Sequence, residues 1–321
     1  MADETLGHKT SRITYDVLVK QTWFVWFRRL YVLSLLIFVI AYKTFWAPDI
    51  LFLMGLSVFA LYGLGKDFVK KFLPFVLLLV AYESLRGFAP YVTKHVHYRA
   101  MIDFDTWLGR GTIPTVRLQH LLYQGYLTWY DYYFYTLYMM HFFVPFIFAV
   151  WIWRTRLAEY WRYVISLIVL SFSAFVTYIA FPAAPPWMAS NQGLIPTIEK
   201  LSHDIWWGWG VHNFPTIYHD LNPNTVAAVP SLHSAYPMLT VLFIFRLYGW
   251  KFGVPAMLYP ISVWVGVVYM GEHYVFDVLL GILYALVAYF VTNYSFDRFE
   301  GRKIAKMTPV ELLEPVMPKK A

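Results

Sequence analysis

Two short histidine-containing segments carry the residue types that group-transfer chemistry needs. The first is Pro230-Ser231-Leu232-His233, and the second begins at His273, which Asp277 follows by four residues. On a helix, this spacing stacks the carboxylate one turn below the imidazole. A carboxylate there can hold one ring nitrogen and leave the other as a nucleophile, and a second histidine can protonate a leaving oxygen. The two segments therefore outline a phosphoryl- or acyl-transfer site.

Both histidines open long apolar runs in a chain of 321 residues that is 59% hydrophobic and only 14% charged. Soluble domains are nearer a quarter charged. Eight apolar segments are long enough to cross a hydrocarbon core of roughly 30 Å. We therefore predict an all-α, polytopic transmembrane bundle of about eight spans. The segments run approximately over 30–47, 49–65, 72–92, 129–153, 160–181, 231–249, 252–270 and 273–294.

The distribution of charge predicts the topology. If the spans alternate, most of the 26 Lys and Arg residues fall on the side that holds both termini, which the positive-inside rule makes cytoplasmic. The net charge of +7 then reflects topology, and no nucleic-acid partner is expected. We predict a cytoplasmic segment 1–29, a single transmembrane domain 30–294 and a cytoplasmic tail 295–321. The plasma membrane is the expected location, and both histidine motifs lie at the extracytoplasmic face.

Two long loops, about 92–128 and 182–230, are expected on that outer face. Within the first, Asp103–Gln119 has apolar and basic residues typical of a helix lying in the membrane interface. The chain has no cysteine, and its loop histidines fit no ligand spacing, so neither a metal nor a cofactor is expected. His141, near the middle of the fourth segment, is expected to be structural.

The two motifs resemble the second and third signatures of the type 2 phosphatidic acid phosphatase (PAP2) superfamily, with Leu232 in place of the usual glycine. The resemblance implies that His273 attacks phosphorus, that Asp277 orients it and that His233 is the general acid. Ser231 and Tyr274, within the same motifs, become candidate substrate-binding residues.

Other parts of the superfamily pattern are missing. Gly266 and Val267 stand where the third signature normally has Ser-Arg, and the first signature has no good match. The inositol phosphorylceramide synthase (aureobasidin-resistance) branch is similar in this respect, and Phe181–Trp187 resembles its Pro-Pro loop. A phosphate still needs cations. Arg86, Arg110 and Arg117 are the candidates we favour for binding it, from the outer-face set Arg86, Lys94, Arg99, Arg110, Arg117 and Lys200.

Three functions remain open from the sequence. The first is a lipid phosphotransferase that forms a phosphohistidine and moves a head-group phosphate, inositol-phosphate-like, onto a lipid alcohol. The second is a phosphatase that uses water to hydrolyse phosphatidic acid or a polyprenyl diphosphate. The third is a non-enzymatic, proton-coupled transporter, which would place ionisable residues near the bilayer midplane and often has repeated halves. The clustering of the motif residues at one face and the absence of an evident repeat favour an enzyme whose partners are a phospholipid or polyprenyl phosphate and the membrane.

Overall fold

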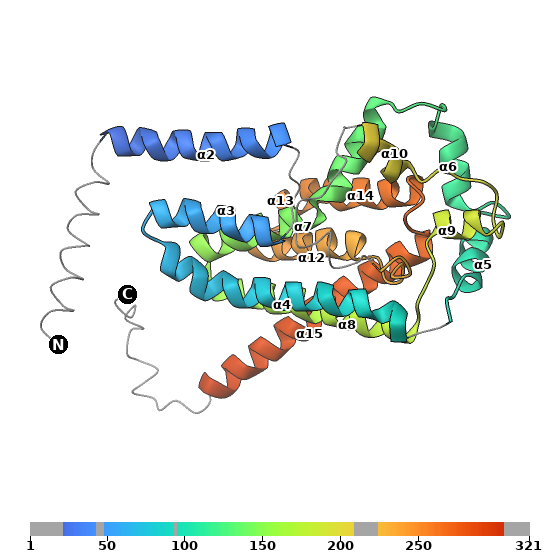
Figure 1. Ribbon diagram of the computed structural model, residues 1–321. Coiled ribbons are helices and arrows are strands. Elements are labelled where there is room, and N and C mark those ends of the chain that lie inside the picture. The colour runs from blue at the N-terminus through green and yellow to red at the C-terminus, as the bar shows by residue number, and fades with distance from the viewer. Residues whose placement is uncertain (1–21, 43–47, 93–94, 209–223, 305–321) are drawn as a thin grey trace, which may run out of the picture.

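The computed structural model describes residues 22–42, 48–92, 95–208 and 224–304. Regular structure in these ranges is helical, apart from isolated bridges that join His97 to Ala183 and Ala183 to Ala227. The helices, arranged as in Figure 1, are α2 (Thr22–Tyr42), α3 (Pro48–Leu61), α4 (Gly65–Val92), α5 (Arg99–Leu108), α6 (Pro114–Leu122), α7 (Trp129–Thr155), α8 (Leu157–Ala180), α9 (Pro186–Asn191), α10 (Leu201–Gly208), α12 (Leu232–Tyr248), α13 (Trp250–Ala256), α14 (Leu258–Tyr269) and α15 (Val275–Ile304).

Every predicted span overlaps a helix, and within the described residues three stretches are long and apolar enough to cross a bilayer by themselves. They are Leu157–Ala180, Trp250–Tyr269 and Val275–Phe299. A fourth is the bent pair Trp129–His141 and Phe143–Thr155, whose halves meet at 50°. Pro145 explains the bend, because it cannot donate a backbone hydrogen bond to the preceding turn. The all-helical membrane architecture is therefore supported, whereas the count of eight spans stays a prediction.

Helical structure extends across both predicted domain boundaries. Helix α2 begins at Thr22, ahead of residue 30, and α15 continues to Ile304, so helix covers part of each predicted flanking segment. The division into two cytoplasmic segments and one transmembrane domain stays a prediction. Polar residues in these extensions have partners within the protein. The Arg28 guanidinium lies 4.5 Å from the centre of the Tyr62 ring. At the other end, the Asp297 carboxylate is 2.6 Å from a guanidinium nitrogen of Arg162.

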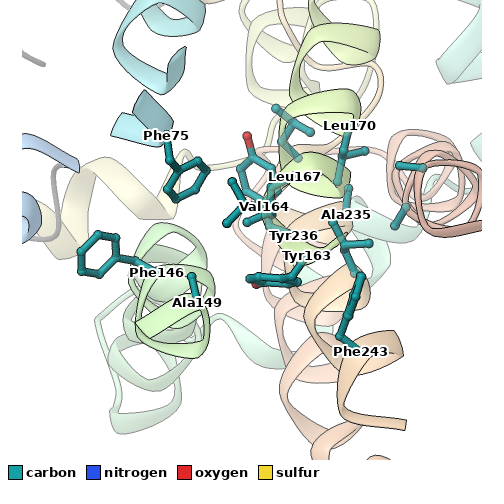
Figure 2. Close-up of a cluster of buried hydrophobic side chains, with 14 of the residues drawn as sticks. Phe75, Phe146, Ala149, Tyr163, Val164, Leu167, Leu170, Ala235, Tyr236 and Phe243 are labelled. Atoms are coloured by element: carbon teal, nitrogen blue, oxygen red, sulfur yellow. The ribbon is translucent and has the colours of Figure 1, made fainter. Parts of the chain in front are cut away.

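Helix α8 lies at the centre of the bundle, against α4, α7, α12 and α15. Its buried positions recur every three or four residues, which directs one broad face into the core. Figure 2 shows Tyr163, Val164, Leu167 and Leu170 of this face beside Phe243 and other side chains of the neighbouring helices. The outer surface of α15 is instead apolar and exposed, with Leu283, Val287 and Phe290 each at least half exposed. Such a surface suits contact with lipid rather than water.

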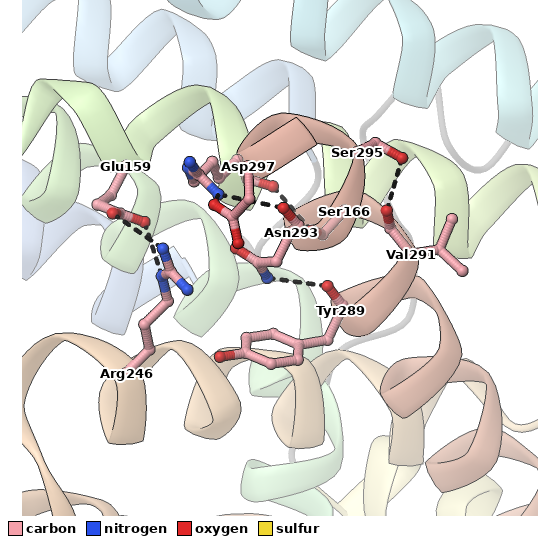
Figure 3. Close-up of polar contacts among 9 residues, drawn as sticks. Glu159, Ser166, Arg246, Tyr289, Val291, Asn293, Ser295 and Asp297 are labelled. Atoms are coloured by element: carbon pink, nitrogen blue, oxygen red, sulfur yellow. Dashed lines mark hydrogen bonds and ion pairs between the residues drawn. The ribbon is translucent and has the colours of Figure 1, made fainter. Parts of the chain in front are cut away.

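The two ends of the bundle differ. Helices α5, α6, α9 and α10 gather at one end (Figure 1). Residues at the opposite end form ion pairs, among them Arg246 with Glu159 and Arg162 with Asp297; Figure 3 labels three of these four residues. The single interfacial helix predicted over Asp103–Gln119 is wrong in one respect, since the chain breaks there into α5 and α6. Arg110 has a φ of 53° in the intervening turn, and Pro114 opens α6.

Candidate active site

The histidines of the two motifs meet at the end of the bundle that carries the short helices. His233 lies in the first turn of α12, and His273 lies in the turn between α14 and α15. Nδ1 of His233 is 3.1 Å from Nε2 of His273. Ser231 helps to start α12, because its hydroxyl oxygen accepts a hydrogen bond from the backbone N–H of Ser234 at 3.3 Å. The structure thus joins residues that are forty positions apart in the chain.

Asp277 contacts the other ring nitrogen of His273. Its Oδ2 lies 3.3 Å from Nδ1 of His273 and accepts the backbone N–H of Tyr274 at 2.9 Å. The stacking of both residues on one helix was a wrong expectation, because His273 precedes α15 and the Asp277 side chain reaches back from the first helical turn. The carboxylate is fully buried. It therefore favours the tautomer with a proton on Nδ1 and leaves the lone pair of Nε2 directed at His233.

Close backbone contacts hold the two motifs together. The Ser231 N–H donates to the backbone oxygen of Asp277 at 3.1 Å, and the Tyr178 hydroxyl donates to the Pro230 oxygen at 2.8 Å. Gly281, one turn further along α15, makes this approach possible, since a Cβ there would lie 2.3 Å from the backbone oxygen of Ser231. Only glycine fits between α12 and α15 at this point.

Helix α7 supplies two rings that pack against His233. The Tyr138 ring stacks on His233 with a centroid distance of 4.2 Å, and the His141 ring lies 4.1 Å from it. Nδ1 of His141 is 2.7 Å from the backbone oxygen of Tyr138, which fixes the orientation of the His141 ring. The expectation that His141 is purely structural missed this contact with the site. Its position depends on the bend in α7, which a local sequence pattern does not reveal.

The turn that carries His273 is held from several loops. Gly271, with a φ of 77°, accepts a hydrogen bond from the Trp187 backbone N–H at 3.1 Å. The buried amide of Gln119 donates to the Tyr269 oxygen at 2.9 Å, and the Ser202 hydroxyl donates to the Glu272 carboxylate. These contacts hold residues 269–272 in place, so that the turn leads into α15 in a defined position.

Asp105 of α5 also reaches this turn and was not singled out from the sequence. Its two carboxylate oxygens accept hydrogen bonds from the backbone N–H groups of Val275 and Phe276, at 2.9 and 3.0 Å. These are the first two residues of α15. The side chain is fully buried. Burial raises the pKa of the Asp105 carboxyl from 3.8 to about 6, against the opposing effect of the two hydrogen bonds.

The predicted substrate-binding residues are differently placed. Arg110 and Arg117 are exposed, and the Arg117 guanidinium donates to the Gly109 backbone oxygen at 2.8 Å. Ser231 and Tyr274 are fully buried. The Arg86 side chain lies outside the described residues, as does Lys94, although the backbone of Arg86 belongs to α4.

The positions that replace the usual Ser-Arg of the third signature are packing positions. Val267 is fully buried, and a Cβ on Gly266 would meet the Phe134 ring of α7 at 3.0 Å. Cations for a phosphate therefore have to come from other elements. Within the part of the chain that the structure describes, no group of three or more His, Asp or Glu side chains has the arrangement of a metal site.

Comparison with known families agrees with this geometry. A family model described as the PAP2 superfamily matches residues 99–291, which is more than half of the chain and includes both histidines and Asp277. The chain belongs to the PAP2 superfamily. Membership confirms the resemblance drawn from the two motifs and supports the prediction of an enzyme of the phosphotransferase or phosphatase type.

Two curated relatives are similar to this PAP2 chain. A phosphoinositol dihydroceramide synthase of Bacteroides thetaiotaomicron is 30% identical over 167 residues, which are 49% of this chain and 54% of the relative. An inositol phosphorylceramide synthase of Candida albicans is 29% identical over 131 residues, 37% of this chain and 26% of the relative. The chain thus matches about half of the first relative and a quarter of the second. No solved structure matches.

Proposed function

We propose that this protein is a membrane-embedded lipid phosphotransferase that works through a phosphohistidine on His273. The observation that carries the proposal is the line of contacts from Asp277 through His273 to His233, at 3.3 and 3.1 Å. One imidazole is oriented by a buried carboxylate, and its free nitrogen faces a second imidazole. A nucleophile and a proton donor thus lie next to each other, in contact in the free protein, where an incoming phosphate could meet both.

In the first half-reaction, Nε2 of His273 attacks the phosphorus of a phospholipid. The bond from phosphorus to the diacylglycerol oxygen breaks, and His233 in its imidazolium form gives a proton to that oxygen. The head-group phosphoryl is then bonded to Nε2. Because the two ring nitrogens are 3.1 Å apart in the free protein, the rings have to separate when the phosphate enters. Asp277 stabilises the positive charge that develops on the His273 ring.

In the second half-reaction, the hydroxyl of a lipid alcohol attacks the same phosphorus. His233, now neutral, accepts the hydroxyl proton, the bond from phosphorus to Nε2 breaks, and both histidines return to their starting forms. The names of the two relatives favour an inositol-phosphate head group and a ceramide-type acceptor. Water in place of the alcohol would give a phosphatase, because either acceptor meets the same activated phosphorus.

Lipid products formed by the purified protein test this proposal. The full chain is incubated in vesicles with phosphatidylinositol, phosphatidic acid or a polyprenyl diphosphate, with and without ceramide, and the products are identified by mass spectrometry. We expect an inositol phosphate ester of ceramide and diacylglycerol, formed without any ion gradient. Head-group phosphate released at the same rate with and without ceramide would identify a phosphatase. Absence of every product would contradict the enzyme proposal.

Arg86, Arg110 and Arg117 are proposed to bind the substrate phosphate, with Arg86 and Arg117 contributing most. Gln119 ties α6, and with it Arg117, to the turn that carries His273. A charge-assisted hydrogen bond contributes about 1.5–3 kcal/mol, so each loss in the transition state should slow turnover about tenfold to a hundredfold. Arg86→Gln and Arg117→Gln test this, with exposed Arg298→Gln as the control. Full activity in both variants would exclude Arg86 and Arg117 as the phosphate-binding residues.

The site is proposed to face the extracytoplasmic side of the plasma membrane, with both termini in the cytoplasm. The chain has no cysteine, so single introduced cysteines report cleanly. We expect that a cysteine replacing exposed His203 reacts with an impermeant maleimide in intact cells, whereas one replacing exposed Arg298 does not. The reverse labelling would put the active site on the cytoplasmic side.

A further inference from the structure

The first turn of α15 is capped by a residue from a distant helix. Helix N-termini leave backbone N–H groups without partners, and a nearby side chain usually fills this role. Here Asp105 of α5, 170 positions away, accepts both the Val275 and the Phe276 N–H. We propose that Asp105 is a positioning residue that keeps His273 aligned on Asp277 by holding the first turn of α15.

The geometry connects this cap to the nucleophile directly. The first turn of α15 contains Asp277, and its Oδ2 holds both Nδ1 of His273 and the Tyr274 N–H. If the N–H groups of Val275 and Phe276 lose their acceptors, the turn can open. The distance between His273 and Asp277 then increases, and Nε2 no longer points steadily at phosphorus. A misplacement of about 1 Å can cost a factor of about 10² in rate.

A matched control lies on the same helix. Asp103 is also an aspartate of α5, but it is exposed. Replacing it removes the same charge from the same helix without removing an acceptor from α15. A general effect of charge on α5 or on protein stability would appear in both variants, whereas the positioning effect belongs to Asp105 alone.

The charge state of Asp105 gives a second signature. Burial, with a smaller contribution from the nearby charge of Asp277, raises the pKa of the Asp105 carboxyl to about 6 against the effect of its two backbone hydrogen bonds. The titratable groups on the α15 side are Asp277, His273 and Tyr274, and those on α5 itself are Asp103 and Arg99. Protonation turns one carboxylate oxygen into a neutral hydroxyl, which is a much weaker acceptor for a backbone N–H, so positioning should weaken as the pH falls through about 6.

Stability should respond in the opposite direction. Because the folded-state pKa of Asp105 lies above its usual value of 3.8, the folded protein binds this proton more tightly than the unfolded chain does. Protonation between about pH 6 and 4 therefore stabilises the fold through this group. A loss of rate in this window without a loss of stability separates positioning from simple unfolding.

Kinetics of the full-length protein in phosphatidylinositol and ceramide vesicles test the inference, which rests on the proposed function. We expect Asp105→Ala to lower kcat by about 10²-fold with little change in KM, and Asp105→Asn to be intermediate, because an amide oxygen can accept one of the two N–H groups. Asp103→Ala should match the wild type. As the pH is lowered through about 6, the ratio of the wild-type rate to the Asp105→Asn rate should decrease. Wild-type rates in both Asp105 variants, or an equal loss in Asp103→Ala, would overturn the inference.

A measurement that needs no turnover separates this inference from the proposed function. Nitrogen NMR of labelled histidine, with the His273 signal assigned by its absence in His273→Gln, reports which ring nitrogen carries the proton. We expect the Nδ1–H tautomer in the wild type and in Asp103→Ala, and a mixture of tautomers in Asp105→Ala and Asp105→Asn. An unchanged tautomer in the Asp105 variants contradicts positioning, even if the wild type should turn over none of the lipids tried.

Discussion

The two ends of α15 both carry an aspartate that contacts a cationic or ionisable residue, and the two pairs are built in opposite ways. Near the start of the helix, Asp277 is fully buried and contacts His273, which is charged only when protonated. Near its end, Asp297 is 60% exposed and lies 2.6 Å from Arg162, which always carries its charge. Figure 3 shows Asp297 close to Asn293, whose backbone oxygen also accepts from the Arg162 guanidinium.

The difference separates a pair that can do chemistry from one that only joins helices. A permanent ion pair that is partly open to solvent contributes little free energy and cannot move a proton. A buried carboxylate next to a histidine fixes one tautomer and stabilises positive charge when it develops on the ring. The remaining contacts at the site end, from Asp105 and His233, act on the same ring or on the turn that carries it. Substitutions at the Asp277 end of α15 should therefore change turnover strongly, whereas substitutions at the Asp297 end should change stability only slightly.

The largest effect is expected for Asp277→Asn. The amide keeps the volume and one oxygen acceptor, but it can present its NH₂ to the histidine and favour the wrong tautomer. A comparable change in serine-protease triads lowers kcat by about 10⁴, and we expect a loss of about 10² to 10⁴ here. Turnover of the lipid substrate measures it, with the thermal unfolding midpoint as the control for folding. Turnover equal to the wild type would remove Asp277 from the mechanism.

His233→Ala tests whether His233 is the general acid and His273 the nucleophile. General acid catalysis is typically worth about 10²–10⁴-fold, so the variant should lose that factor on a phospholipid. A p-nitrophenyl phosphate ester has a leaving group that needs no proton, and its first half-reaction should be largely spared. The rate of nitrophenolate release by His233→Ala and His273→Ala measures the difference. Equal losses by both variants on both substrates would mean that the assigned roles are wrong.

Gly281→Ala tests the contact between the two motifs. The added Cβ would meet the backbone oxygen of Ser231 at 2.3 Å, so α12 and α15 must move apart. Such overpacking typically costs about 1–3 kcal/mol of stability, and the separation of His233 from His273 should reduce turnover by about tenfold or more. Leu283→Ala, at a lipid-facing position of the same helix, is the control. Normal turnover in Gly281→Ala would show that this close approach is not required.

The smallest effect is expected for Asp297→Asn at the other end of α15. The carboxylate charge beside Arg162 is lost, but the guanidinium keeps its bond to the Asn293 oxygen at 3.3 Å and its contact with the Phe296 ring. Unfolding free energy should fall by no more than about 1 kcal/mol, and turnover should be unchanged. Chemical denaturation and the lipid assay measure the two quantities. A loss of turnover as large as that of Asp277→Asn would show that the Asp297–Arg162 pair is not merely structural.

The sequence predicted the parts of the site that depend on local spacing. The Asp277–His273 contact joins residues four positions apart, as expected, although His273 lies before α15 rather than on it, and the meeting of His233 with His273 follows from two apolar segments that begin at the same end of the bundle. The break at Gly109–Ile113 could have been found, since glycine and proline flank it.

Asp105 and His141 could not be found in this way. Their partners lie 170 and 92 positions away, and only the packing of α5 and the bend of α7 bring them to the site. Long-range contacts of this kind leave no periodic signal in a single chain.

The measurement that tests the central claim most directly is the location of the covalent intermediate. The protein is mixed with labelled phosphatidylinositol without an acceptor, quenched in alkali, which preserves a phosphorus–nitrogen bond, and digested for mass spectrometry. We predict an inositol-phosphate adduct on His273 that is absent from His273→Ala, and that disappears from the wild type when ceramide is added. Turnover without an adduct, or an adduct on His233, would contradict the account.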